Sequence, residues 1–211
     1  MEWLDVVDAE DRPLGITKLK QDIHQDGDWH RTTHIYVMNP AGELLCNLRH
    51  PDKDLFASLW DMSFGGHVSA GEAYADGARR ELEEEAGIRV EPHEISYLYS
   101  IAGDGYDVVS GLIDREHTAV FLYETDRPLE AFTYQQEEIS ALRFVSISQL
   151  RQHLREPDGR FPLVPLGAMY AYALDRLTDY RNGLLPNSAE RPRFSWRDAL
   201  KTDGLPSRNA P

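Results

Sequence analysis

The segment from Gly65 to Ile88, GGHVSAGEAYADGARRELEEEAGI, constrains the fold most strongly. If it is helical, with about 100° between residues, its small and apolar side chains share one narrow face. These side chains are Ala75, Ala78, Leu82 and Ala86. Such a face can pack closely on a β-sheet, and Gly87 is placed to end the helix. The sequence therefore predicts a helix that follows a glycine-rich loop and lies on a sheet.

Three glutamates, Glu81, Glu84 and Glu85, lie beside this face at helical spacings. Like charges on adjacent turns repel, so the cluster indicates a positive partner. Carboxylate oxygens are hard ligands, and the expected partner is Mg²⁺ or Mn²⁺, with Ca²⁺ as a non-catalytic competitor. Glu83 points elsewhere and is expected to be solvated. The alternative is that RRELEEE is merely a solvated helix face.

Glycines and one arginine support a ligand site. Gly77 projects from the same arc as the glutamates, which leaves space for an ion and its waters. The carbonyl of Gly66 can face a cation, since glycine allows close backbone approach. Arg80 lies one turn before Glu84, so it can pair with that carboxylate or reach a phosphate.

Short extended and helical segments fill the rest of the chain. Strand patterns occur at residues 2–8, 33–38, 43–49, 59–66, 94–101, 118–125 and 141–147. Residues 39–42 suit a turn that would join two of these strands as a hairpin. Helices are predicted at 146–156, with Ser146 or Ser148 as N-cap, and at 166–183. This irregular order favours a mixed sheet flanked by helices over a doubly wound fold.

The chain divides by composition near residue 155. We expect residues 1–155 to form the main domain, and residues 156–211 to form a C-terminal helix and a partly extended tail packed on or near it. The tail contains RPRFSWR, which is locally basic, whereas the body is acidic. A loosely docked tail is favoured over a functional arm.

The charge and the cysteine content indicate which partners and which cell compartment to expect. The net charge of −14 argues against nucleic acid as a partner, because backbone binding requires a basic surface. The single cysteine, Cys46, fits a reducing compartment. The acidic N-terminus has no secretory h-region, and no stretch is long enough to span a membrane. We therefore expect a cytoplasmic protein without a membrane partner.

The whole glycine-bounded segment resembles the Nudix box. Gly66 is followed after five residues by Glu72, and after seven more by Arg80 and Glu81. The remaining positions of the pattern are Leu82, Glu84, Glu85, Gly87 and Ile88. The resemblance implies an α/β/α sandwich with a mixed β-sheet. It also implies hydrolysis of a small-molecule diphosphate, either a nucleoside diphosphate derivative or another organic diphosphate.

The resemblance assigns roles residue by residue. Metal ligands would be Glu81, Glu84, Glu85 and the carbonyl of Gly66, while Arg80 and Glu72 would brace the loop. Water attacks phosphorus, and a carboxylate accepts its proton. That base would be Glu85, or a later glutamate, of which Glu138 ranks slightly above Glu137. Members of the superfamily are often dimers, which makes a homodimer one expectation.

Outside the box the chain resembles the isopentenyl-diphosphate isomerases and the hydrolases close to them. The cues are VVDAEDRPLG, WHRTTHIYVMNPAGELLCNLR, LWDMSFGGHVSAGE and DREHTAVFLYE. Isomerases bind a metal through three histidines and two acids. The matching positions here are His24, His30, His67, Asp114 and Glu116. His67 and Glu116 join the predicted metal ligands, and His24, His30 and Asp114 complete a possible second metal site; unconnected histidines are the alternative.

The chain departs from the isomerase pattern at a residue that the isomerase reaction requires. The isomerase cysteine precedes the glycine-histidine pair, and that position here is Gly65. Cys46 lies mid-strand, where a small buried hydrophobe is expected. Hydrolysis therefore leads over isomerase-like activity and over a non-enzymatic, metabolite-binding protein.

Overall fold

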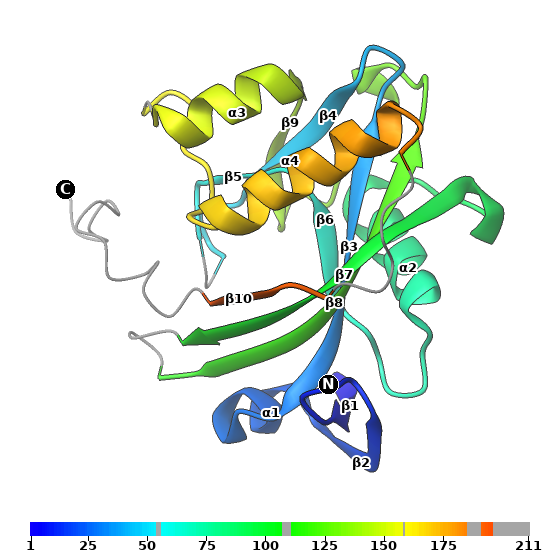
Figure 1. Ribbon diagram of the computed structural model, residues 1–211, viewed down its shortest axis with the longest axis vertical. Helices are drawn as coiled ribbons and strands as arrows, with labels where there is room; N and C mark the ends of the chain where they lie inside the picture. Colours follow the sequence, from blue (N-terminus) through cyan, green and yellow to red (C-terminus); the bar gives the residue numbers. More distant parts are fainter. Residues whose placement is uncertain (54–55, 107–110, 158, 185–190, 196–211) are drawn as a thin grey trace.

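The computed structural model describes residues 1–211 except 54–55, 107–110, 158, 185–190 and 196–211. A mixed sheet runs in the order β10-β7-β8-β3-β1-β2, and β4, β5, β6 and β9 join it through β3 and β4 (Figure 1). The strands are β1 (Trp3–Val7), β2 (Pro13–Leu19), β3 (Trp29–Met38), β4 (Glu43–Arg49), β5 (Trp60–Asp61), β6 (Phe64–His67), β7 (Ile95–Tyr106), β8 (Ile113–Glu124), β9 (Ile139–Ser146) and β10 (Arg193–Ser195). The helices are α1 (Lys20–Asp26), α2 (Tyr74–Ala86), α3 (Ile147–Arg155) and α4 (Gly167–Arg181), with short 3₁₀ turns at Pro92–Glu94 and Leu129–Ala131.

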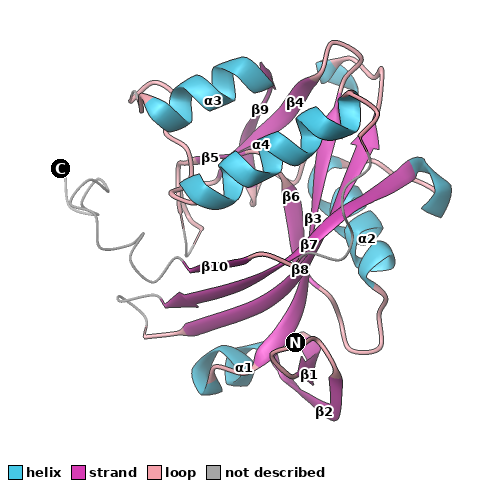
Figure 2. Cartoon of the chain, viewed as in Figure 1, coloured by secondary structure: helices cyan, strands magenta, loops and turns pink. Residues whose placement is uncertain are grey.

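Strand β3 is the centre of the fold. It pairs in parallel with β8 along its whole length and antiparallel with β6. Its alternate side chains enter two separate cores, because successive residues of a strand point to opposite faces. Ile35 and Val37 pack with the apolar face of α2, whereas Tyr36 and Met38 pack on the side of α3 and α4. Helices thus cover both faces, as Figure 2 shows, and the predicted α/β sandwich is confirmed.

Helix α2 has the predicted form. Ala78, Leu82 and Ala86 are fully buried and Ala75 is partly buried, so the small apolar face packs on the sheet. The helix ends at Gly87, which adopts a left-handed conformation with φ of 66° and donates its N–H to the carbonyl of Glu83. Local periodicity was sufficient to locate this helix.

Helix α3 also begins where the sequence predicts. Ser146 is its N-cap, and the side chain accepts a hydrogen bond from the backbone N–H of Gln149. The side chain of Gln149 returns to the backbone of Ser146, which completes a capping box.

The predicted hairpin at residues 33–49 is wrong beyond its turn. Gly42 donates its N–H to the carbonyl of Asn39, but within the described residues β3 and β4 pair at Met38 and Leu44 alone. The two strands separate because β6 occupies the same edge of β3 at residues 32–35, while β4 pairs with β9 and β5. Pairing with strands far away in the sequence therefore determines the arrangement of β3 and β4 more strongly than the turn at residues 39–42.

Two N-terminal elements were missed by sequence reasoning. Strand β2 folds back on β1, and α1 follows β2 directly. Five of the seven residues of β2 are exposed, so it lacks a clear alternation of polar and apolar side chains. In α1 the buried side chain is Ile23, which gives no helical stripe.

The C-terminal region packs on the same sheet. Helix α4 contributes Tyr170, Ala173 and Leu174 to a core, and β10 pairs in parallel with residues 102–104 of β7. This pairing differs from the expected loosely docked tail, whose remaining residues lie outside those described. The division into two units at residue 155 stays a prediction. No helix in the described ranges is long and apolar enough to cross a membrane.

Truncating the buried face of α2 should destabilise the fold. Leu82→Ala removes a fully buried side chain, and we expect the free energy of unfolding to fall by about 2–5 kcal/mol. Urea unfolding would measure the loss. The matched control is Glu83→Ala on the next residue, which is exposed and should lose far less. Equal losses for the two variants would contradict the observed orientation of α2.

Candidate active site

Two glutamates of α2 converge on the backbone of Gly65 and Gly66. A β-carbon on Gly66 would lie 2.6 Å from Oε1 of Glu81, so this carboxylate occupies space that only glycine leaves open. The N–H of Gly65 donates to Oε2 of Glu85 at 3.2 Å. Strand β6 places both glycines opposite His34 and Thr33 of β3.

The two carboxylates carry more charge than their surroundings neutralise. Burial raises the pKa of Glu81, although neighbouring Arg80 acts in the opposite direction. Burial, followed by the charge of Glu81, raises the pKa of Glu85 to about 8. Paired, buried carboxylates of this kind favour either a proton or a cation among them.

Arg80 ties the glycine loop to the helix. Its guanidinium donates to both carboxylate oxygens of Glu72 at 3.1 Å and to the carbonyl of His67 at 2.8 Å. It also donates to Glu81 at 2.6 Å and to Glu84 at 3.3 Å. Glu72 in turn accepts from the N–H of Ser69. These bonds fix the loop against the first turns of α2.

Glu84 and Gly77 lie differently from the expectation. The Glu84 side chain is 55% exposed and directed at Arg80, whereas Glu81 and Glu85 point inward. Gly77 does not open space beside the glutamates: a β-carbon there would lie 3.3 Å from Glu72 and 3.4 Å from Val68. Gly77 thus makes room for the carboxylate that holds Arg80. Glu83 is exposed and pairs with Arg89, as predicted.

The later glutamates occupy the loop that precedes β9. The N–H of Gln135 donates to the carbonyl of Glu85 at 3.3 Å, which brings this loop to the end of α2. Glu138 forms an ion pair with Lys53. Glu137 is exposed. Of the two candidate bases, Glu138 has the anchored side chain.

Five residues from four elements form a second group, which we call the histidine cluster: His24 of α1, His30 of β3, His67 of β6, and Asp114 and Glu116 of β8. The ring centroid of His24 lies 4.9 Å from that of His30 and 5.2 Å from that of His67. Nε2 of His30 lies 3.7 Å from Asp114 and 3.8 Å from Glu116. Within the described ranges, two sets of three bring ligand atoms within 4.8 Å, and both belong to this cluster.

The cluster contains buried ring nitrogens that have no hydrogen-bond partner. Nδ1 of His24 donates to the carbonyl of Lys20, and Nδ1 of His30 donates to that of Asp28. Because a carbonyl only accepts, Nδ1 carries a hydrogen in both rings, and a neutral ring then keeps the lone pair on Nε2. Burial lowers the pKa of His30 to about 4, which keeps the ring neutral. Buried atoms without a hydrogen-bond partner include Nε2 of His30, Nε2 of His67 and Oδ1 of Asp114.

Sequence reasoning missed two polar groups near Gly65. His34 lies opposite Gly65 on β3, and a β-carbon at 65 would lie 3.0 Å from its ring. Asp61 accepts hydrogen bonds from Ser63 and, at 3.0 Å, from the hydroxyl of Tyr170 on α4. The alternation of β3 could have placed His34 on the same face as His30. No local pattern links Asp61 to Tyr170.

The structure disfavours a thiol at the isomerase position. A β-carbon on Gly65 would lie 2.1 Å from the carbonyl oxygen of Thr33, so this backbone has no room for cysteine. Cys46 is fully buried, as predicted, and burial raises the pKa of its thiol. It packs in the core with Met38 and Leu44.

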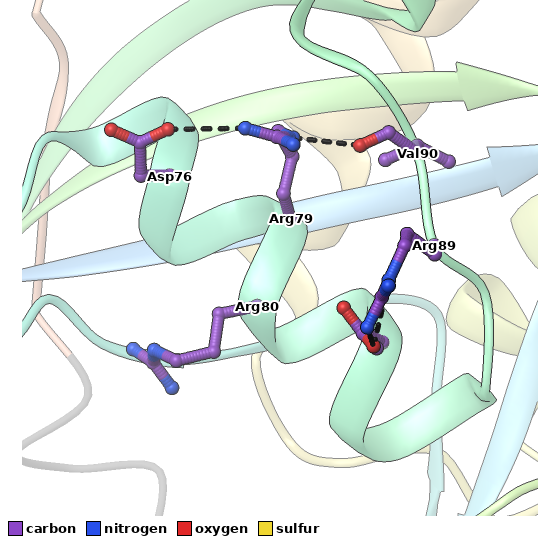
Figure 3. Close-up of a pocket in the computed structure, with 6 residues that line it drawn as sticks. Asp76, Arg79, Arg80, Arg89 and Val90 are labelled. Carbon is purple, nitrogen blue, oxygen red and sulfur yellow. Dashed lines mark hydrogen bonds and ion pairs between the residues drawn. The ribbon is translucent and has the colours of Figure 1, made fainter.

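A shallow hollow beside α2 shares Arg80 with this site, and also the exposed pair of Glu83 and Arg89, but none of the other residues described above. It is lined by Asp76, Arg79, Arg80, Glu83, Arg89 and Val90 (Figure 3). Its arginines already have partners: Arg79 contacts Asp76 and the carbonyl of Val90, and Arg89 pairs with Glu83. The hollow therefore offers no uncompensated positive charge to an anion.

A sheet covered on both faces, with a glycine loop leading into a glutamate helix, defines a Nudix-type domain. The NUDIX domain family matches residues 28–166, and the chain belongs to this family. The crystal structure of DR0079 from Deinococcus radiodurans has the same fold, with a TM-score of 0.64 and 22% identity. The match covers 81% of this chain and 98% of that one.

Curated relatives include hydrolases and isomerases. An uncharacterised Nudix hydrolase of Clostridium acetobutylicum is 34% identical over 76% of this chain and 78% of its own length. Nudix hydrolase 3 of Arabidopsis thaliana is 32% identical over 82% of this chain, but the match spans 23% of that longer protein. Isopentenyl-diphosphate Delta-isomerase 2 of Photorhabdus laumondii is 34% identical over 71% of this chain and 80% of its own length.

Replacing the arginine that ties loop to helix should weaken the fold. Arg80→Lys keeps the charge but cannot reach Glu72, Glu81 and the carbonyl of His67 together. We expect the free energy of unfolding to fall by about 2 kcal/mol, the scale of one or two charge-assisted hydrogen bonds. Chemical denaturation would measure this fall. Arg89→Lys, at an exposed ion pair, is the control; a comparable loss there would show that Arg80 has no special role.

Proposed function

We propose that this protein is a metal-dependent hydrolase of a diphosphate linkage in a nucleoside diphosphate derivative or another organic diphosphate. The observation that carries the proposal is the convergence of Glu81 and Glu85, both largely buried, on the backbone of Gly65 and Gly66. Family membership supports it, because Nudix hydrolases act on diphosphate linkages.

The residues present fit a hard divalent cation. Glu81 lies against Gly66, and burial disfavours the unneutralised charge of Glu85. Glu81, Glu85 and the carbonyl of Gly66 would hold Mg²⁺ or Mn²⁺, and Glu84 would join them by turning from Arg80. When bound, the ion neutralises charge on the phosphate oxygens and makes a water molecule more acidic.

The chain's own groups position the reactants and move the proton. Arg80 and Glu72 hold the loop, which keeps the backbone at Gly66 against Glu81. Water attacks phosphorus, and a carboxylate accepts its proton. Glu85 and Glu138 are the leading candidates for this base. Glu137 is the weaker one, because its exposed side chain leaves it less well placed.

We also propose that the histidine cluster binds a metal ion. Mixed imidazole and carboxylate ligands suit Mn²⁺, Mg²⁺ or Zn²⁺. The unpartnered ring nitrogens of His30 and His67 and the unpartnered oxygen of Asp114 support this assignment, since buried polar atoms without partners are costly. His24 and Glu116 would complete the ligand set.

Glu85→Gln should abolish turnover while leaving the fold intact. A screen of organic diphosphates with Mg²⁺ or Mn²⁺, followed by phosphate detection, would identify a substrate. On that substrate we expect kcat to fall by at least about a hundredfold, because a buried charge at the reacting phosphate is lost. Glu83→Gln is the matched control and should retain activity.

Two outcomes would contradict this function. One is full activity in Glu85→Gln or in the presence of a chelator. The other is deuterium incorporation into isopentenyl diphosphate without release of phosphate, which would establish the isomerase alternative. Stabilisation by ligand and Mg²⁺ without any turnover would instead favour a metabolite-binding protein.

The histidine cluster can be tested without a substrate. Co²⁺ added to the wild-type protein should give visible d–d absorption typical of imidazole ligation. We expect His67→Asn to weaken Co²⁺ binding by more than about tenfold, since loss of even an outer-shell partner of a metal site costs 10–100-fold. Glu85→Gln should keep the spectrum, because Glu85 lies outside the cluster. An unchanged affinity in His67→Asn would exclude His67 as a ligand.

A further inference from the structure

The segment that supplies His24 has little apolar packing of its own. We call residues 3–26, comprising β1, β2 and α1, the N-terminal unit. Within the described residues its separate core consists of Leu4, Val6 and Ile23. The unit pairs with β3 through one pair of residues, Val7 of β1 and Trp29. Loop residues 69–71 hold one side of the unit, where Ala70 donates its N–H to the carbonyl of Trp3. With so small a core, the position of the N-terminal unit depends on its contacts with the rest of the chain, among them those of α1 with β8.

Asp11 joins the N-terminal unit to three other parts of the chain. It lies in the turn between β1 and β2, has a φ of 67°, and its side chain is 9% exposed. Its carboxylate accepts from Nε of Arg31 at 2.7 Å, from the hydroxyl of Tyr74 at 3.0 Å and from Arg191 at 3.1 Å. Arg31 is on β3 and Tyr74 begins α2, so Asp11 links these elements to the C-terminal region.

Residues 191–195, which we call the C-terminal strap, reach the same turn from the opposite edge of the sheet. Arg191 also donates to Nδ1 of His117, and Nε2 of His117 donates to the carbonyl of Asp8 at 3.0 Å. Arg193 donates to the carbonyl of Ala9 at 2.9 Å. The strap thus makes three polar links, direct or through His117, to residues 8–11.

The other end of the strap is fixed in the main fold. Arg193–Ser195 pairs with residues 102–104 of β7, and Ala102 donates its N–H to the carbonyl of Pro192. Phe194 packs against the core that contains α4, with its ring 5.8 Å from that of Tyr172. The strap is anchored on β7 and bonded to the turn between β1 and β2. It can therefore limit the motion of the N-terminal unit.

We propose that the C-terminal strap positions His24 for metal binding by holding the N-terminal unit against the sheet, with Arg191 as the positioning residue. His24 is the member of the histidine cluster supplied by this unit, and its Nε2 lies 3.5 Å from Asp114. Metal–ligand distances tolerate deviations of only about 0.2 Å, so a small displacement of α1 removes a ligand. The inference rests on the proposed metal site but not on diphosphate hydrolysis.

The test compares Arg191→Ala with wild type in the full-length chain. Hydrogen–deuterium exchange should accelerate in residues 3–26 and stay unchanged in α2. Co²⁺ affinity should fall about fivefold to tenfold, with an altered d–d spectrum because one imidazole is lost. Arg191→Lys should restore part of the affinity, since it keeps a positive charge beside Asp11. Arg89→Ala, an arginine in an exposed ion pair, is the matched control and should change neither readout.

A double-mutant cycle separates positioning from general stabilisation. In a His24→Asn background, Arg191→Ala should cause no further loss of Co²⁺ affinity. A further loss of equal size would overturn the inference, as would accelerated exchange with unchanged affinity, unchanged exchange, or absence of Co²⁺ binding in the wild type. If Arg191→Ala does not fold, Arg193→Ala gives the same readouts. None of these measurements involves turnover, so a failed search for a diphosphate substrate would leave this test intact.

Discussion

The guanidinium of Arg80 holds together the two halves of the candidate active site. It bonds Glu72 and the carbonyl of His67 on the loop and Glu81 on the helix, so the loop cannot move without breaking several charge-assisted bonds. Through these bonds the glycine backbone stays close to the inward-pointing carboxylates. Arg80 offsets part of the charge of Glu81, whereas Glu85 remains largely uncompensated. This difference between the two carboxylates supports the proposal of a cation at this site.

Strand β6 connects this site to the histidine cluster. Gly66 lies against Glu81 of α2, and the next residue, His67, stacks with the ring of His30 at 5.2 Å. Adjacent residues of a strand point to opposite faces, so one short strand serves two groups of different chemistry. One group is all carboxylate and suits a hard cation; the other is rich in imidazole. Because the two groups offer different ligand types, metal binding by each group can be tested independently.

The similarity to isomerases shows that the fold alone does not decide the reaction. This chain is 34% identical to an isopentenyl-diphosphate isomerase over 71% of its length, and its histidine cluster brings together the five residues that the isomerase resemblance predicts as metal ligands. The difference lies at Gly65, where the carbonyl of Thr33 fills the space that a cysteine β-carbon would need. The thiol of Cys46 is enclosed in the core. The proposed activity is therefore hydrolysis, which needs a carboxylate base and no thiol.

The sequence by itself determined the features that depend on neighbouring residues. It gave the position of α2, its end at Gly87, the N-cap of α3 and the arc of the helix that carries Glu81, Glu84 and Glu85, because helical periodicity and capping act over a few residues. It did not predict that Glu84 turns outward to Arg80. Tertiary structure alone decided the rest. It separated the strands of the predicted hairpin by placing β6 along the same edge of β3, fixed the distances within the histidine cluster that the isomerase resemblance had grouped, and joined Arg191 to Asp11. These contacts join segments far apart in the chain, so their energies depend on the packing of the whole sheet and leave no local pattern to read.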